Sequence, residues 1–242
     1  MRNIRRGPNT DGLDIDCCSD VWITNCDLCT GDDAIAVKSD IALLGYDKAC
    51  ERIHISGNTL SSTCCAIRFG FEGDGAIRDI IMTDNIIIDS NIGIDILSML
   101  HWKVFQPHLQ IYKGTPVENI IIRQIVMRNV RQAFKLWNYT SDPKDIDELQ
   151  GYIKNITLAD MYIEAVDSSF IGGKNVSGIR LENIRMNVVR FPDACKKKAV
   201  EIQDVWGQGY LPKPLTLFND PGVEMKNVDI TESFCCRTNP AE

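Results

Sequence analysis

The chain has 242 residues, of which 44% are hydrophobic and 24% charged, with a net charge of −7 and an isoelectric point near 5.1. The length suffices for one domain with a sizeable core, so we expect a single domain over residues 1–242. The acidic balance disfavours binding to nucleic acid or to an anionic membrane, and no apolar run reaches the roughly 18 residues of a transmembrane helix.

Short apolar segments rich in isoleucine and valine recur along the chain, each bounded by Asn, Asp, Gly or Ser. In chain order they are VWITN at 21–25, IHISGN at 53–58, IIMTDN at 80–85, IIIR at 120–123, ITLAD at 156–160 and IRLEN at 179–183. A β-rich run that ends in turn-forming residues is typical of a strand.

A second set of segments lies among them and follows the pattern small, apolar, variable, apolar. Its members are GLDI at 12–15, AIAV at 34–37, AIRF at 66–69, GIDI at 93–96 and AFKL at 133–136, spaced by 22, 32, 27 and 40 residues. Repeats of this size with insertions of variable length indicate a solenoid, and coils of ~20–30 residues made of strands favour an all-β, right-handed parallel β-helix.

Stacked coils place equivalent residues about 4.8 Å apart. The small residues of the second pattern are then expected to form one buried ladder, and the variable residues to point away from their apolar neighbours. These variable residues are Asp14, Ala36, Arg68, Asp95 and Lys135. Two interpretations of this charged ladder stay open: a solvated, mutually paired surface, or the wall of a sugar-binding cleft.

Three acids coincide in the same register. Asp11 and Asp33 are equivalent positions of adjacent coils, and Asp32 precedes Asp33. Carboxylates this close cannot all ionise freely, so at least one pKa is expected to rise. A protonated acid beside ionised carboxylates suits glycosidic cleavage, with neither cofactor nor resident metal. A calcium site built from the same carboxylates is the alternative.

NTDG at 9–12 and GDD at 31–33, separated by a cysteine-containing strand, resemble the two acidic motifs of family 28 glycoside hydrolases, which include polygalacturonases and rhamnogalacturonases. The resemblance has specific motifs from residue 9 to about residue 100. It implies a right-handed parallel β-helix that hydrolyses pectic chains with inversion. It also implies Asp32 as general acid, Asp11 and Asp33 as the residues that position and activate water, a carbohydrate substrate, and a secreted or periplasmic location, although no signal peptide is visible.

The chain departs from the family pattern at two motifs. Cys65 stands where the family has the histidine of Gly-His-Gly, and Asp95-Ile96-Leu97 stands where it has Arg-Ile-Lys. We therefore expect altered substrate recognition, with ordinary polygalacturonate not favoured. The candidate substrate-binding residues are Asn9, Asp14, Lys38, Arg68, Glu72 and Asp95. For Arg68 two roles stay open, contact with substrate or simple pairing with Asp95.

Two other functions compete with hydrolysis: a carbohydrate-binding β-helix with a decayed site, and a calcium-dependent polysaccharide lyase. In the family several coils precede the first acidic motif, whereas eight residues precede it here. An open first coil exposes strand edges, so we expect a homo-oligomer or a further segment to cover that end. The ten cysteines are expected to fill small buried positions, and a bridge from Cys195 to Cys235 or Cys236 stays open.

Overall fold

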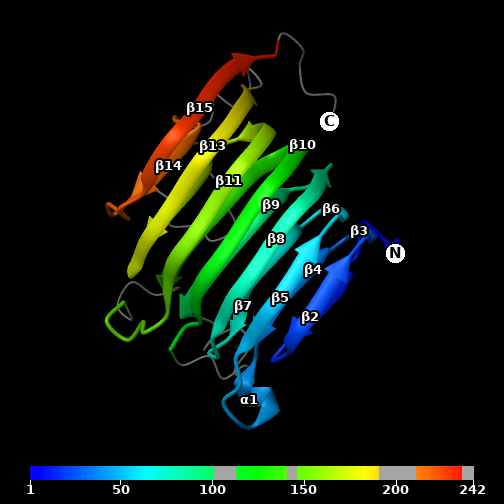
Figure 1. Ribbon diagram of the computed structural model, residues 1–242, viewed down its shortest axis with the longest axis vertical. Coiled ribbons are helices and arrows are strands. Elements are labelled where there is room, and N and C mark those ends of the chain that lie inside the picture. The colour runs from blue at the N-terminus through cyan, green and yellow to red at the C-terminus, as the bar shows by residue number, and fades with distance from the viewer. Residues whose placement is uncertain (101–112, 141–145, 191–210, 236–242) are drawn as a thin grey trace.

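The computed structural model describes residues 1–100, 113–140, 146–190 and 211–235, and in them the chain forms a stack of strands (Figure 1). The strands are β1 Leu13–Asp16, β2 Ser19–Thr24, β3 Asp27–Thr30, β4 Ile35–Ser39, β5 Cys50–Ser56, β6 Thr59–Ser62, β7 Cys65–Gly73, β8 Ile77–Ile88, β9 Ile92–Leu100, β10 Pro116–Thr140, β11 Tyr152–Asp167, β12 Ser169–Gly173, β13 Val176–Arg190, β14 Leu215–Phe218 and β15 Glu224–Phe234. One short helix, α1 Ile41–Leu44, follows β4. No helix in the described segments is long and apolar enough to cross a membrane.

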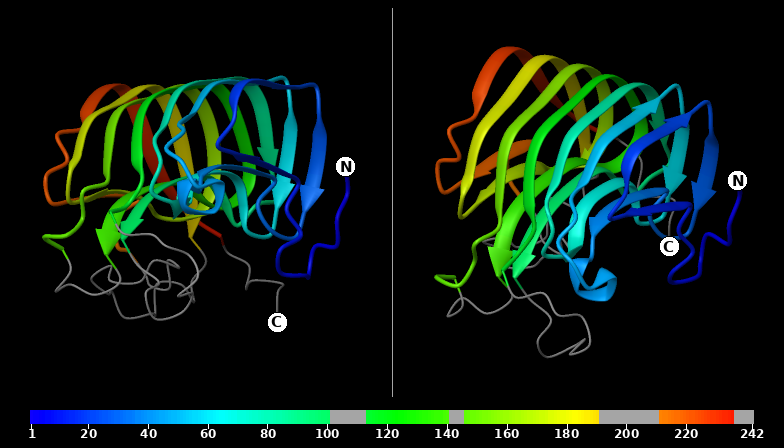
Figure 2. Two further views of the ribbon diagram at one scale, coloured as in Figure 1. Left: turned by 90° about the horizontal axis from the view of Figure 1, so that it is seen from below. Right: turned by 60° about the horizontal axis from the view of Figure 1, so that its bottom comes forward.

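The strands form three parallel faces that wind around one axis (Figure 2). The first face stacks β1, β4, β7, β9, the C-terminal part of β10, β12 and β14. The second stacks β2, β5 and the N-terminal parts of β8, β10, β11, β13 and β15. The third stacks β3, β6 and the later parts of the same long strands. The predicted right-handed parallel β-helix is confirmed.

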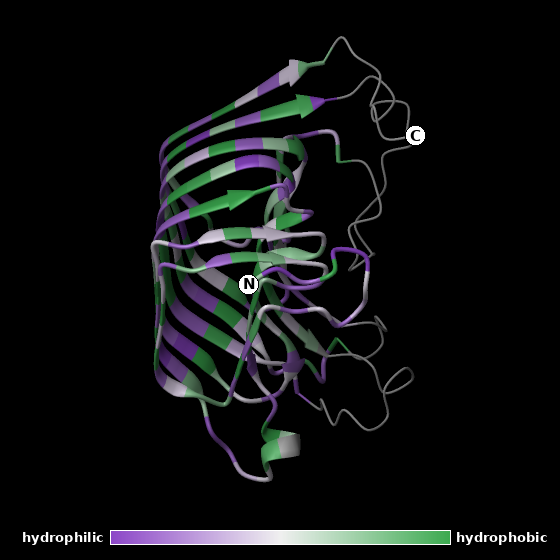
Figure 3. Ribbon diagram, turned by 90° about the vertical axis from the view of Figure 1, so that its right-hand side faces the viewer, coloured by the Kyte–Doolittle hydropathy of each residue, from purple (hydrophilic) through white to green (hydrophobic). Residues whose placement is uncertain are grey.

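The register of the first face is the predicted one. Leu13 pairs with Ile35, which pairs with Ile67, and the ladder continues through Ile94 to Phe134. Four of these five side chains are fully or almost fully buried, and they join one continuous core that runs the length of the solenoid. Figure 3 shows hydrophilic and hydrophobic residues alternating along the outer strands. Because successive side chains of a strand point to opposite faces, the hydrophobic residues of each strand face this core.

Left-handed residues bend the strands at two equivalent positions of successive coils. Near the start of the second face they are Asp20, Arg52, Asp79, Asn119, Asn155 and Gly178; at its corner with the third face they are Asn25, Gly57, Asp84, Gln124, Asp160, Asn183 and Asn227. Because one left-handed residue turns the chain without a loop, five of the strands run through the corner and are longer than the sequence pattern indicated.

A buried asparagine ladder supports the second corner from inside. Asn58 accepts the backbone N–H of Cys26 at 2.9 Å and donates to the Ile23 carbonyl at 3.1 Å. Asn85, one coil later, accepts the Asn58 N–H at 2.9 Å and donates to the Ile55 carbonyl at 3.1 Å. These side chains satisfy backbone groups that the bend removes from the strand ladder.

The N-terminal end of the solenoid is partly covered. Residues 1–3 lie along β3, with hydrogen bonds from Asn3 N–H to the Cys29 carbonyl and from Cys29 N–H to the Met1 carbonyl. In the described residues β1 pairs only with β4, and β2 only with β5, so both keep one unpaired edge. Covering of that end by a second copy or a further segment stays a prediction. The described cysteines are free thiols, and Cys195 and Cys236 lie outside the described residues.

Candidate active site

The acidic residues lie where two adjacent coils enter the first face. Asp11 immediately precedes Gly12 and β1, and Asp32 and Asp33 occupy the turn between β3 and β4. The two loops are joined by hydrogen bonds from Gly12 N–H to the Asp33 carbonyl at 2.8 Å and from Asp32 N–H to the Thr10 carbonyl at 3.4 Å. A Cβ on Gly12 would lie 2.4 Å from the Ala34 carbonyl oxygen, so this close approach requires glycine.

The three carboxyl groups converge as predicted. One oxygen from each of Asp11, Asp32 and Asp33 lies within 4.8 Å of the other two. Asp33 is buried, while Asp11 and Asp32 are partly exposed and so remain accessible to a ligand. Repeat register alone therefore brings acids 21 and 22 residues apart in the sequence into one small volume.

The carboxyl groups of Asp11 and Asp32 lie in different environments. Asp32 accepts the backbone N–H of Asn9 at 3.0 Å on one oxygen and the N–H of Asp33 at 3.0 Å on the other. Burial, followed by the charges of Asp14, Asp32 and Asp33, raises the pKa of Asp11 from its ordinary 3.8 to about 7. Asn9, a predicted substrate-binding residue, contacts the triad through its backbone.

The carboxylate of Asp33 contacts residues of the next coil. Its Oδ1 accepts the Cys65 N–H at 3.2 Å, and its Oδ2 lies 3.1 Å from Arg68 Nη1. Arg68 Nε in turn lies 3.1 Å from Asp95, and Lys135 Nζ lies 3.2 Å from the other oxygen of Asp95. Burial raises the pKa of Asp33, and the neighbouring Arg68 opposes that rise.

The charged ladder is buried in its central part. Arg68, Asp95 and Lys135 expose 8%, 0% and 3% of their side chains. The interpretation of these three as a solvated surface is therefore wrong, because alternation fixes which way a side chain points but not whether water reaches it. Of the two roles left open for Arg68, the structure shows the pairing with Asp95.

A second, more accessible group lies on the same face. Lys38 Nζ lies 3.1 Å from Asp14 and 3.6 Å from Glu72. Burial raises the pKa of Glu72 in spite of the nearby Lys38 and Arg68. Burial alone would lower the pKa of Lys38, but Glu72 and Asp14 outweigh it and raise that pKa. Of the predicted binding residues outside the triad, these three and Asn9 are partly or fully exposed, whereas Arg68 and Asp95 are buried.

Cys65 takes no position that suits a nucleophile. Its side chain is fully buried, and its Sγ lies 3.0 Å from Arg68 Nη2 and 3.5 Å from Asp95 Oδ2. Burial raises its pKa well above the ordinary value, so the group is a neutral thiol. Sequence reasoning did not include Cys64 or Lys135 among the site residues, although the repeat register already placed Lys135 on the ladder.

A cation could contact either of two compact sets of donors, the triad or Asp33 with Cys64 and Cys65. A calcium ion takes about six to eight oxygen ligands, and Arg68 already supplies positive charge to Asp33. Calcium binding by these donors stays an alternative to be tested.

The family model described as glycosyl hydrolases family 28 matches residues 1–132. A probable polygalacturonase from Vitis vinifera is 29% identical over 231 residues, which cover 90% of this chain and 44% of that protein. The family 28 exopolygalacturonase of Yersinia enterocolitica superposes with a TM-score of 0.57 at 16% identity, covering 96% of this chain and 40% of that one. An exopolygalacturonase from Thermotoga maritima gives a TM-score of 0.48 at 19% identity, over 91% of this chain and 45% of that one.

The chain spans less than half the length of these relatives. The structural likeness, at this low identity, bears on the fold alone. The family model covers more than half of the chain, including both acidic motifs. The chain therefore belongs to glycosyl hydrolases family 28.

Proposed function

We propose that the protein is an inverting glycoside hydrolase that cleaves a pectin-like glycan. The convergence of Asp11, Asp32 and Asp33 within 4.8 Å at the start of two adjacent coils carries this proposal. One carboxylic acid protonates the departing glycosidic oxygen while a carboxylate removes a proton from the attacking water. Family membership supports the same reaction class.

The family resemblance gives Asp32 the role of acid, and Asp11 and Asp33 the role of positioning and activating water. In the unliganded protein the retained proton is favoured on Asp11, whose pKa of about 7 is raised first by burial. Asp32 instead accepts two backbone hydrogen bonds, from the N–H groups of Asn9 and Asp33. Asp32 then acts as acid after receiving the proton that the closely spaced triad shares.

A substrate with a good leaving group distinguishes Asp32 from Asp11 as the general acid, because its cleavage needs no proton donor. If Asp32 is the acid, Asp32→Asn loses activity on a natural glycan but recovers it on a nitrophenyl or fluoride glycoside. Asp11→Asn, which removes a residue that activates water, stays inactive on both. Recovery confined to Asp11→Asn would transfer the acid role to Asp11.

Inversion is supported by the family resemblance and not by the spacing of the carboxyl groups. Oxygens within 4.8 Å lie nearer to the separation of about 5–5.5 Å found in retaining glycosidases than to the ~6.5–9.5 Å of inverting ones. The anomer that is released first measures the stereochemistry directly.

The accessible charges indicate which glycans fit. Lys38 is the partly exposed cation of the site and already pairs with Asp14 and Glu72. Asp95, which replaces an arginine of the family motif, is buried and paired. A uronic carboxylate would meet net negative charge here, so we propose neutral or esterified glycans in preference to polygalacturonate.

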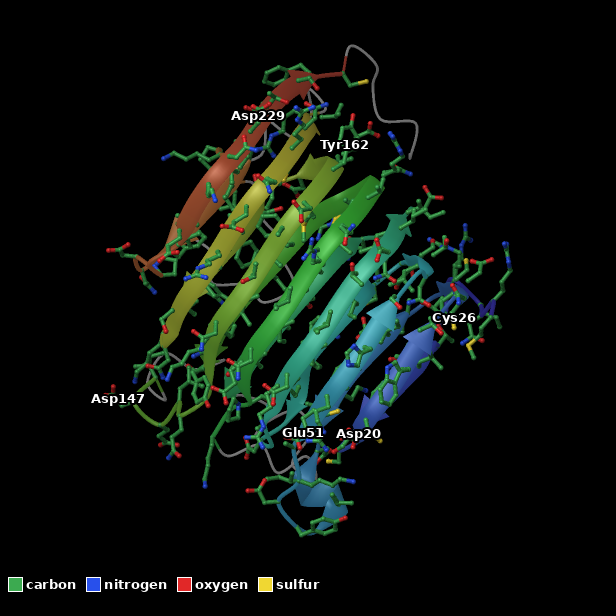
Figure 4. All side chains as sticks on the ribbon, in the orientation of Figure 1. Asp20, Cys26, Glu51, Asp147, Tyr162 and Asp229 are labelled. Carbon is green, nitrogen blue, oxygen red and sulfur yellow. The ribbon has the colours of Figure 1, made fainter. Side chains whose placement is uncertain are left out.

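A panel of pectic, neutral and sulfated glycans tests the proposal, with wild type, Asp32→Asn and a chelator. The exposed Asp229→Asn variant, on the outer face in Figure 4, serves as the matched control. Turnover that is lost in Asp32→Asn and survives the chelator supports hydrolysis. Loss on chelation would favour the calcium-dependent lyase, and binding without turnover would favour a decayed carbohydrate-binding site.

A further inference from the structure

Arg68 is anchored on every side of its guanidinium group. Nη1 lies 3.1 Å from Asp33 and Nε 3.1 Å from Asp95. Nη2 donates to Cys65 Sγ at 3.0 Å and to Cys64 Sγ at 3.5 Å. The guanidinium carbon also lies 5.0 Å from the centre of the Phe71 ring. A planar guanidinium bound at all three nitrogens is held in one orientation.

This anchoring links the triad to the buried ladder. Among the described residues Arg68 is the one cation within ion-pair distance of Asp33, and Asp11 and Asp32 have no ion pair there. Asp95 lies between two cations, Arg68 and Lys135. The charges therefore alternate from Asp33 to Lys135, and each buried carboxylate has a neighbour of opposite sign, as burial of charge requires.

We propose that Arg68 is a positioning residue that orients the Asp33 carboxylate, and that it does not bind substrate. To reach a ligand, its buried side chain would have to leave two ion pairs and two thiols. One of those ion pairs would then leave Asp33 buried without its cation. The proposal rests on the proposed function for the role of Asp33 in activating water.

The titration of Asp33 reports this arrangement. The titratable groups that face it are Asp11 and Asp32 in the two loops, Cys64 beside β7, Cys65, Arg68 and Glu72 on β7, and Asp95 on β9. Carboxyl ¹³C NMR on aspartate-labelled full chain, with Asp33→Asn for assignment, measures the Asp33 pKa in each variant.

Arg68→Gln removes the cation, and we expect the Asp33 pKa to rise by about 1–3 units. Asp95→Asn removes a like charge and leaves Arg68 to Asp33, so we expect the Asp33 pKa to fall by about 1 unit. Arg68→Lys keeps the charge and should hold the Asp33 pKa within about 1 unit of wild type. Shifts of opposite sign are a result that general loosening of the fold would not produce.

Arg190→Gln is the matched control, because Arg190 is also fully buried and paired, with Asp167 and Glu232 on coils remote from Asp33. It should destabilise the fold without moving the Asp33 pKa. An unchanged Asp33 pKa in Arg68→Gln, or shifts of the same sign in Arg68→Gln and Asp95→Asn, would overturn the proposal.

Kinetics separate positioning from substrate binding. On a glycan that wild type hydrolyses, Arg68→Gln should lower kcat by about 10–100-fold with KM unchanged. The acidic limb of the pH–rate profile of this variant should shift with the Asp33 pKa that NMR measures. A raised KM at unchanged kcat would contradict the proposal. If wild type hydrolyses no glycan, the proposed function fails, while the titration of Asp33 still decides whether Arg68 is the cation that pairs with it.

Discussion

Two ladders of alternating charge cross the coils of this solenoid, one on the outer face and one within it. On the outer face, where Figure 4 labels Asp20 and Glu51, Arg52 lies 2.7 Å from Asp20 and also pairs with Glu51. Their exposed side-chain fractions are 58%, 49% and 16% for Asp20, Arg52 and Glu51. In the inner ladder, Arg68 and Asp95 expose 8% and 0%.

The difference shows that the stacking of coils determines which charged side chains lie in contact. Their exposure to solvent determines how much each pair contributes to the stability of the fold. Each ladder contains a pair of equivalent residues on adjacent coils, Asp20 with Arg52 on the outer face and Arg68 with Asp95 within. In water, a pair such as Asp20 with Arg52 gains little and each member can be replaced alone. In the buried ladder each charge depends on its neighbour, because removal of one leaves another without compensation.

Removing a charge from the buried ladder should lower the unfolding free energy more than any other change considered below. Arg68→Gln leaves Asp33 without its cation, and we expect unfolding free energy to fall by about 3–5 kcal/mol, measured by urea denaturation. The matched outer variant, Arg52→Gln, should leave the denaturation midpoint within experimental scatter of wild type. Equal losses in the two variants would contradict the distinction between the ladders.

A variant in the asparagine ladder distinguishes the stability cost of an unpaired buried polar group from that of an unpaired buried charge. Asn58→Ala leaves the Cys26 N–H and the Ile23 carbonyl without their partner, so we expect a loss of about 1–3 kcal/mol in the same denaturation experiment. A loss as large as that of Arg68→Gln would show that burial of any polar group, rather than uncompensated charge, sets the size of the effect.

The acidic triad should destabilise the fold as the pH rises. Since burial and neighbouring acids raise the Asp11 pKa from 3.8 to about 7, the folded protein holds this proton more tightly than the unfolded chain and loses stability between those pH values. Asp11→Asn removes this loss. Allowing for partial exposure, we expect it to be more stable than wild type by about 1–2 kcal/mol near pH 8 and equal near pH 4.

Thermal or urea unfolding of wild type and Asp11→Asn across that pH range measures the difference. Asp20→Asn is the control on the outer face, where the pair with Arg52 lowers the pKa of Asp20. Any effect of Asp20→Asn should be small and of the opposite sign, because that carboxylate stabilises the fold when ionised. A pH-independent effect of Asp11→Asn would contradict the raised pKa.

Salt should produce the smallest change. Raising sodium chloride from about 0.05 M to about 0.5 M screens exposed charges, so any small effect of Arg52→Gln should disappear. The effect of Arg68→Gln should persist, since its partners are buried. Loss of the Arg68→Gln effect in salt would indicate that water reaches the inner ladder.

Much of the fold followed from the repeats, because a strand period of two and a constant register determine which residues stack. The same register brought Asp11 beside Asp33 and placed Arg68 next to Asp95. Strand ends were predicted less well, since turn residues such as Asp84 bend a strand here without ending it. The burial of Asp95 and the contact from Arg68 to Asp33 depend on side-chain reach and on neighbouring segments, which periodicity does not contain.

The most direct test of the central claim is ¹H NMR of the first product released from an esterified, α-linked pectic oligosaccharide. We predict a β anomer at the new reducing end before mutarotation, the result of inverting hydrolysis. A first-formed α anomer would show retention, and an olefinic proton would show elimination by a lyase. Either result would contradict the account.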